Sequence, residues 1–114
     1  EHAYAMANAE QMTSVFNNLI KNALQSVAPE KEAVIKCSLR LDGDNIEIAV
    51  ADNGRGIAPE VQDKIFRPNF TTKSTGMGLG LAIVKTIIVN AQGEIWFETE
   101  LEKGTTFHVR LPKV

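Results

Sequence analysis

Three polar side chains on the first apolar helix of this sequence could do chemistry together. Asn18 and Asn22 are four residues apart and Lys21 is three from Asn18, so all three project from adjoining positions beside the apolar stripe. Carboxamide oxygens can ligate a divalent cation without the charge cost of clustered carboxylates, and an ammonium can donate to phosphate. Asparagine is a mediocre helix former. The presence of Asn17, Asn18 and Asn22 within six residues therefore indicates that something other than helix stability favours asparagine at these positions. For this helix alone, a solvated polar face is the alternative interpretation.

A second polar cluster follows a run of alternating apolar residues. Asp52 comes directly after that run, and Gly54 and Gly56 follow at intervals of two. A carboxylate at a strand end can accept a hydrogen bond from an exocyclic amine, and a glycine lets a flat ring approach the main chain. Taken alone, these residues also have the composition of a simple turn.

Three glycines at alternate positions, Gly76, Gly78 and Gly80, lead into the second apolar helix. Free amides and the positive end of a helix dipole favour a phosphate there, and Lys73 just upstream adds a positive charge. The spacing lacks the third glycine of the dinucleotide fingerprint and the Gly-Lys-Ser/Thr of a Walker loop. A hinge that binds no ligand is the alternative interpretation.

Hydrophobic periodicity predicts the elements that position these groups. Apolar residues at helical spacing predict one helix from Met12 to Val27 and another from Leu81 to Ala91, with Gly93 as its stop signal. A short helical segment is expected near Pro59. Alternating residues predict two hairpins. Their apolar strand positions are Ala33, Ile35, Cys37, Leu39 and Leu41; Ile46, Ile48 and Val50; Ile95, Phe97 and Leu101; and Phe107, Val109 and Leu111.

The order of these elements predicts an α+β fold. Two layers are expected, a sandwich with both helices on one face of a mixed, mainly antiparallel sheet. The 114 residues suit a single domain, 1–114. A net charge of −2 does not favour binding to nucleic acid or an anionic membrane through bulk positive charge, and no apolar stretch reaches membrane-spanning length. The alternation around the lone Cys37 predicts a buried thiol.

These motifs, in this order, resemble the catalytic domain of two-component sensor histidine kinases. Residues 18–23 are similar to the N box of that family, residues 52–56 to its G1 box, residues 65–73 to its F box and residues 76–81 to its G2 box. Residues 104–107 also resemble its last-hairpin motif. The Phe-Thr-Thr-Lys form of the F box is similar to the nitrogen-regulation branch.

The resemblance implies an ATP-binding domain of the Bergerat type, with ATP and Mg²⁺ as cofactors. Asn22, with Asn18 nearby, would hold Mg²⁺, and Lys21 would contact phosphate oxygens. Asp52 would take the adenine amino group, with Thr105 supporting the ring through water. The nucleotide-binding residues implied in this way are Asp52, Gly54, Gly56, Phe66, Phe70, Lys73, Gly76, Gly78, Leu79, Gly80 and Thr105.

Asn18 occupies the position that separates two activities in the resembled families. In the ATP-hydrolysing relatives this position is typically a glutamate, which takes a proton from the attacking water. A carboxamide is no useful base, so the sequence favours a protein histidine kinase that transfers the γ-phosphate of Mg-ATP to a histidine in two-component signal transduction. The alternatives are a nucleotide-binding module without catalysis, or an anti-sigma-type serine kinase or ATPase of the same fold.

Neither histidine of the chain has the sequence context of a phosphoacceptor. His2 is followed by Ala3, and His108 lies in the last strand with an outward phase, so we expect its side chain to be solvated. We therefore expect the dimerisation and phosphoacceptor domain to lie outside this chain. That domain, a response regulator and ATP are the implied partners, with no nucleic acid and no membrane contact by this segment. The implied location is cytoplasmic, whether or not the full-length protein is anchored in a membrane.

Overall fold

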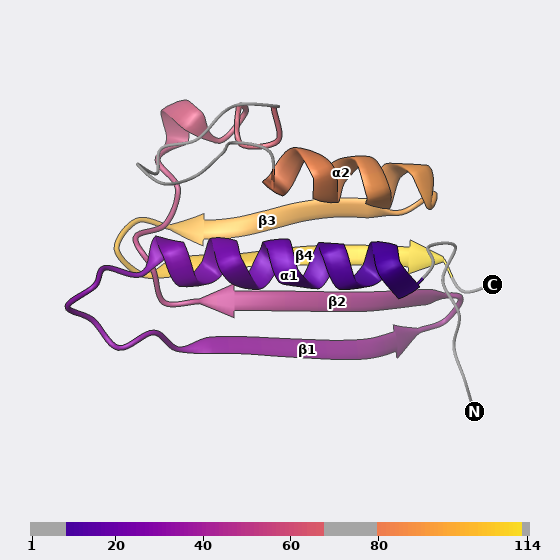
Figure 1. Ribbon diagram of the computed structural model, residues 1–114, viewed down its shortest axis with the longest axis horizontal. Coiled ribbons are helices and arrows are strands. Elements are labelled where there is room, and N and C mark those ends of the chain that lie inside the picture. Colours follow the sequence, from indigo (N-terminus) through magenta and orange to yellow (C-terminus); the bar gives the residue numbers. More distant parts are fainter. Residues whose placement is uncertain (1–8, 68–79, 113–114) are drawn as a thin grey trace.

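The computed structural model describes residues 9–67 and 80–112, which hold two α-helices, one short 3-10 helix and four strands (Figure 1). In chain order these are α1 (Ala9–Ser26), β1 (Ile35–Asp42), β2 (Asn45–Asp52), η1 (Pro59–Val61), α2 (Gly80–Asn90), β3 (Glu94–Glu100) and β4 (Gly104–Pro112). The expected elements are all found. Leu101, expected as a strand residue, instead lies in the turn after β3 and is exposed.

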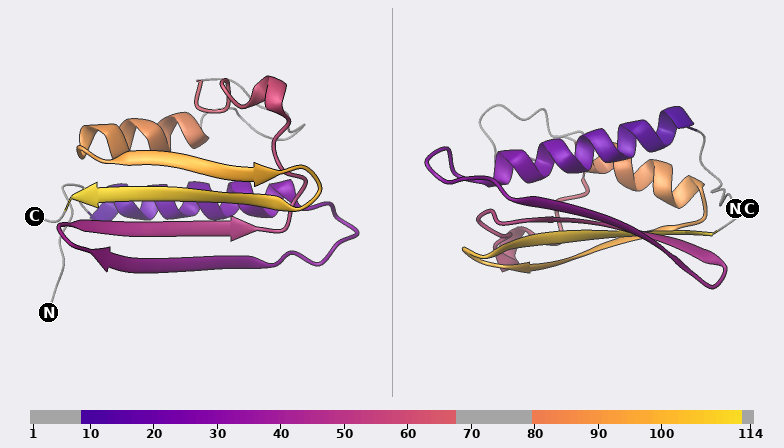
Figure 2. Two further views of the ribbon diagram at one scale, coloured as in Figure 1. Left: turned by 180° about the vertical axis from the view of Figure 1, so that it is seen from behind. Right: turned by 90° about the horizontal axis from the view of Figure 1, so that it is seen from below.

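The four strands form one sheet in the order β1-β2-β4-β3, and every neighbouring pair is antiparallel. Two hairpins, β1–β2 and β3–β4, are joined where β2 pairs with β4 at the centre. Both helices pack on one face of this sheet and leave the other face open, as the edge-on view in Figure 2 shows. The predicted two-layer α+β architecture is confirmed.

The core lies between the helices and the two central strands. Helix α1 lies mainly over β2 and helix α2 lies over β3. Residues four apart on each helix point toward the sheet, because the 3.6-residue helix period and the two-residue strand period both place apolar side chains at this interface. The most deeply buried side chains are Val15, Leu19, Val50, Val84, Ile88, Phe107, Val109 and Leu111. Among the described helices, none combines the length and apolarity needed to cross a bilayer.

Helix α2 ends in a Schellman motif whose left-handed residue is Gln92, not the predicted stop residue Gly93. The Gly93 amide donates to the Ile88 carbonyl at 2.8 Å and the Gln92 amide to the Val89 carbonyl at 2.9 Å. Gln92 has a φ of 64°. Gly93 is needed for a different reason, since a Cβ there would lie 2.4 Å from the Arg110 carbonyl oxygen.

The prediction that Cys37 is buried is wrong, because its thiol is exposed. The alternation was interpreted correctly: Cys37 pairs with buried Val50 and Leu39 with buried Ile48, so both side chains are on the helix side of the sheet. However, β1 is one of the two edge strands of the described sheet, and α1 packs mainly over its neighbour β2. Leu39 on the same face is 62% exposed.

Candidate functional site

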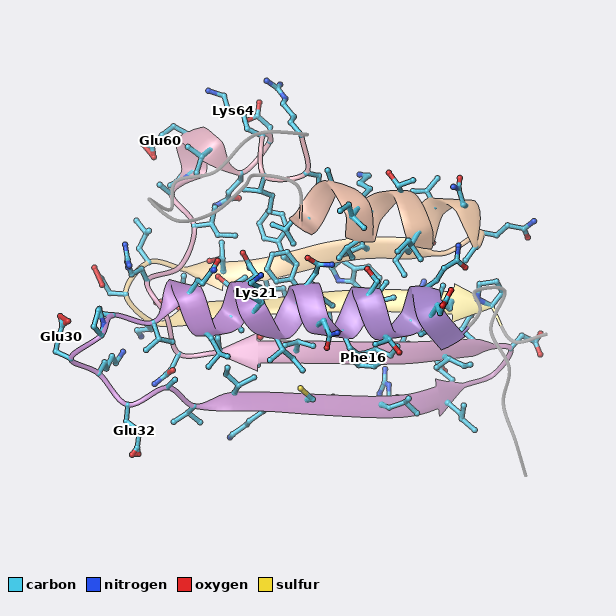
Figure 3. All side chains as sticks on the ribbon, in the orientation of Figure 1. Phe16, Lys21, Glu30, Glu32, Glu60 and Lys64 are labelled. Carbon is cyan, nitrogen blue, oxygen red and sulfur yellow. The ribbon has the colours of Figure 1, made fainter. Side chains whose placement is uncertain are left out.

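The polar edge of α1 brings Asn18 and Asn22 together and leaves Lys21 exposed. Both asparagines are half-buried. The Asn18 amide nitrogen donates to the Ser14 carbonyl at 2.8 Å, which leaves its oxygen Oδ1 to face outward from the helix. Figure 3 shows Lys21 on the side of α1 toward α2 and Phe16 on the opposite edge. Asn18 and Asn22 are thus more buried than Lys21, and the joint role of the three residues stays a prediction.

The amide oxygen of Asn18 lies against the first residue of α2. A Cβ added to Gly80 would come within 2.9 Å of Asn18 Oδ1, so the oxygen and the start of the helix are close neighbours. The first amides of a helix have no intrahelical acceptors and carry partial positive charge. This contact thus places an oxygen ligand and an anion-favouring helix end side by side.

Asp52 ends β2 with one carboxylate oxygen already engaged. Its Oδ1 accepts from the Gly54 amide at 2.8 Å and from the Thr105 amide at 3.3 Å. Among the described residues, none donates to Oδ2. Since these two amides fix the carboxylate plane, Oδ2 has a set direction in which to accept an amine.

The loop after Asp52 is clamped by main-chain contacts at both glycines. A Cβ on Gly54 would lie 2.1 Å from Ser26 Oγ, and the Arg55 amide donates to the Ser26 carbonyl at 3.1 Å. Gly56 has a φ of 78°, and a Cβ there would lie 2.5 Å from the Glu100 carbonyl oxygen. The two glycines thus have structural reasons to be present that need no ligand.

Thr99 and Gly104 complete this end of the site, although neither is among the predicted site residues and the sequence offers Gly104 only as part of the hairpin motif 104–107. Thr99 Oγ1 accepts from the Ile57 amide at 2.9 Å and lies 2.8 Å from Thr105 Oγ1. Gly104 approaches so closely that a Cβ would lie 2.0 Å from the Asp52 carbonyl oxygen. The sequence could have indicated Thr99 only as a threonine paired with Thr105 across the hairpin, and that pairing can be recognised only once the strand register is known.

Phe66 is anchored in an aromatic cluster beneath the helices. Its ring lies 6.2 Å from that of Phe97 and 6.4 Å, edge to face, from that of Phe107. The Lys85 ammonium of α2 sits 4.9 Å from the Phe66 ring centroid, a cation–π contact. These contacts hold the Phe66 ring in place, and its predicted role in nucleotide binding stays a prediction. Five other predicted site residues lie outside the described residues: Phe70, Lys73, Gly76, Gly78 and Leu79.

The open face of the sheet carries a different feature. A hollow of about 240 Å³ lies over Ala49, walled by Trp96 and His108, whose rings stack at 5.3 Å. The prediction that His108 points away from the helices is confirmed. However, its ring stacks on Trp96, and Nε2 is hydrogen-bonded to Glu98 Oε1 at 2.7 Å, so the side chain is not freely solvated. This hollow is separated by the sheet from Asp52, Asn18 and Asn22. Within the described ranges, no three His, Cys, Asp or Glu side chains gather as a metal cluster.

Comparison with known proteins agrees with this geometry. Residues 7–114 match the family described as histidine kinase-, DNA gyrase B-, and HSP90-like ATPase. Sensor histidine kinase ZraS of Escherichia coli (strain K12) is 40% identical over 106 residues, which cover 93% of this chain and 22% of ZraS. The C4-dicarboxylate transport sensor protein DctB of Rhizobium meliloti (strain 1021) is 38% identical, and 17% of it is covered. The chain thus spans about a fifth of the length of these relatives.

Solved structures give the same result. The catalytic domain of histidine kinase ThkA has a TM-score of 0.82 and 33% identity, with 94% of this chain and 69% of that one covered. Full-length ShkA in complex with AMPPNP has a TM-score of 0.76 and 29% identity, with 91% of this chain and 22% of ShkA covered. The finer assignment to the nitrogen-regulation branch stays a prediction. The chain belongs to the family of histidine kinase-, DNA gyrase B- and HSP90-like ATPases, and its fold is that of histidine kinase catalytic domains.

Proposed function

We propose that this domain binds Mg-ATP along α1 and transfers the γ-phosphate to a histidine of a separate dimerisation domain, which then supplies a response regulator. The observation that carries the proposal is that α1 touches both halves of the site. Ser26 contacts Gly54 beside Asp52, and Asn18 contacts Gly80 at the start of α2. These two contacts are eight residues apart, or about 12 Å along a helix, a span suited to an extended nucleoside triphosphate. Asn22 lies midway.

The end at Asp52 suits an adenine ring. Oδ2 of Asp52 can accept from the exocyclic amine, while the amides on Oδ1 hold the carboxylate in place. Thr105, 5% exposed, donates its amide to the same carboxylate and carries a hydroxyl that lies 2.8 Å from Thr99 Oγ1. A base with a carbonyl in place of the amine would face Oδ2 with a second acceptor, so the site discriminates against guanine.

The end at Asn18 suits a triphosphate and its metal ion. Mg²⁺ prefers oxygen ligands, and the tie between the Asn18 amide nitrogen and Ser14 presents an oxygen toward the start of α2. Asn22, one turn along, would provide a second carboxamide. When bound, Mg²⁺ would neutralise phosphate charge, and Lys21 would add a positive charge at the exposed side. Lys73, Gly76 and Gly78 remain predicted phosphate contacts.

Phosphoryl transfer needs little covalent help from such a site. An imidazole nitrogen of the partner domain attacks the γ-phosphorus, the N–P bond forms, and the bond to the β–γ bridging oxygen breaks. ADP leaves with the electron pair, and the phosphorylated imidazolium releases its remaining ring proton to solvent water. The chain's residues orient the phosphates and balance their charge. Asn18 has no basic oxygen with which to activate water, which favours the histidine acceptor. The relatives named as sensor histidine kinases and the AMPPNP complex of ShkA support the same activity.

Calorimetric titration with AMPPNP, with and without Mg²⁺, tests the binding step. The wild-type domain should bind more tightly with Mg²⁺, and Asn22→Ala should lose that dependence. Asn17→Ala is the matched control, because Asn17 is an exposed asparagine on the same helix. A wild-type domain that binds no AMPPNP would refute the proposal.

The chemistry of the product separates the proposed kinase from its alternatives. With γ-labelled ATP and a histidine-bearing dimerisation domain, we expect label on that domain that is lost in acid and stable in alkali, as for a phosphoramidate. Acid-stable label would indicate a serine kinase, and released phosphate without labelled protein would indicate an ATPase. Binding without either product would indicate a nucleotide-binding module.

A further inference from the structure

Thr99 is the hub of a hydrogen-bond network that connects three segments around Asp52. The residue is half-buried on β3 and pairs directly with Thr105 on β4. Its Oγ1 accepts from the Ile57 amide at 2.9 Å, lies 2.8 Å from Thr105 Oγ1 and can donate to the Gly104 carbonyl at 3.2 Å. One hydroxyl of β3 thus contacts the loop after Gly56 and the first two residues of β4.

The hydrogen count of this network determines the chemistry of Thr105. A hydroxyl has one hydrogen to donate and two lone pairs with which to accept. The Ile57 amide occupies one lone pair of Thr99. If Thr99 donates to the Gly104 carbonyl, Thr105 must donate to Thr99 and presents only lone pairs to a ligand. If Thr99 donates to Thr105, the hydrogen of Thr105 becomes available instead.

Thr105 is the buried polar residue of the described chain, and its amide holds Asp52. The position of Thr105 and the path of the 56–57 backbone both depend on Thr99 Oγ1. Removal of that hydroxyl would leave the half-buried Ile57 amide without its acceptor and Thr105 free to rotate.

We propose that Thr99 is a positioning residue for base recognition, an inference that rests on the proposed ATP site. It touches no nucleotide. It holds the Gly56–Ile57 backbone where the flat base would lie and fixes which atoms of the Thr105 hydroxyl face that base. Loss of Thr99 should therefore weaken selection for adenine more than it weakens binding of the phosphates.

The test compares three variants of the domain. Thr99→Val removes the hydroxyl at nearly constant shape, and Thr99→Ser retains it. Thr106→Val is the matched control, because Thr106 is also a half-buried threonine of this hairpin, but it lies on the neighbouring strand β4 and on the open face of the sheet. Each protein is titrated calorimetrically with AMPPNP, GMPPNP and inorganic tripolyphosphate in the presence of Mg²⁺, and its thermal midpoint is measured.

We expect Thr99→Val to weaken AMPPNP binding roughly tenfold or more, which is the loss expected from an unpaired half-buried donor. Tripolyphosphate binding should stay within about twofold, the ratio of AMPPNP to GMPPNP affinity should fall, and Thr99→Ser should restore both. An equal loss for all three ligands would show a purely structural role and overturn the proposal, as would an unchanged ratio. Because the wild type is titrated in parallel, a wild type that binds no AMPPNP would instead refute the proposed function.

Discussion

Replacement of Gly56 by alanine should destabilise the domain much more than the same change at Gly43. Both glycines have a positive φ, 78° and 59°, where an L-residue costs about 1–2 kcal/mol. At Gly43 nothing lies within 4 Å of an added Cβ, so that cost stands alone. At Gly56 the Cβ would lie 2.5 Å from the Glu100 carbonyl oxygen, and forcing the two backbones apart adds about 1–3 kcal/mol. The expected losses are therefore about 1–2 and about 2–5 kcal/mol.

Urea unfolding followed by fluorescence measures this difference, since Trp96 is the single tryptophan of the chain. With a denaturant slope of about 2 kcal/mol per molar urea, the two midpoints should differ by roughly 0.5–1.5 M. Gly56→Ala should also lose AMPPNP affinity at a temperature where it remains folded, whereas Gly43→Ala should bind as the wild type does. Equal midpoints for the two variants would refute the conclusion that the loop is clamped against β3.

Three further outcomes follow from single positions. Gln92→Gly should stabilise the domain by about 0.5–1 kcal/mol, because glycine relieves a left-handed backbone; an unchanged or lower thermal midpoint would contradict this. Cys37 should react with a thiol reagent in the native protein, and a requirement for denaturant would show that it is covered. The pKa of Glu47 is lowered from 4.5, mainly by hydrogen bonds from Arg40. The ionised Glu47 carboxylate therefore stabilises the folded domain above pH 4.5, and this contribution is lost as the pH falls through the lower pKa of the folded state. In a plot of urea midpoint against pH, Glu47→Gln should show a smaller decrease at acid pH than the wild type. Parallel curves for the two proteins would refute the contribution of Glu47 to this pH dependence.

The elements and the polar residues of α1 were predictable because local periodicity determines them. A helix with apolar residues four apart buries that stripe wherever it packs, and Asn18 and Asn22 then lie beside it. The exposure of Cys37 was not predictable in this way, because alternation reports which face of a sheet a residue occupies but not whether its strand is at the edge. The order β1-β2-β4-β3 arises from pairing between distant hairpins, which no local pattern encodes.

Thr99 shows the same limit within the site. Its role depends on the register that places it opposite Thr105 and on the return of residue 57 to β3, a contact across 42 positions of the chain. Gly54 and Gly56 show the converse. That they leave room for a ligand stays a prediction, and the structure adds a reason that the sequence does not reveal, since a side chain at either position would collide with Ser26 or Glu100.

The two ends of the proposed site differ in rigidity, because one is held by closely packed main chain and the other by a side-chain contact. Around Asp52, the glycines at 54, 56 and 104 each lie closer to other protein atoms than a side chain would allow, so this end is fixed by the fold itself. At the other end, Asn18 meets Gly80 through the tip of a side chain, which a single side chain–main chain hydrogen bond to the Ser14 carbonyl orients and which can move when that bond breaks. Base recognition should therefore be preformed, whereas the phosphate end can adjust to its ligand. It follows that substitutions around Asp52 should change stability and affinity together, and that Asn18→Ala should reduce affinity while leaving the urea midpoint nearly unchanged.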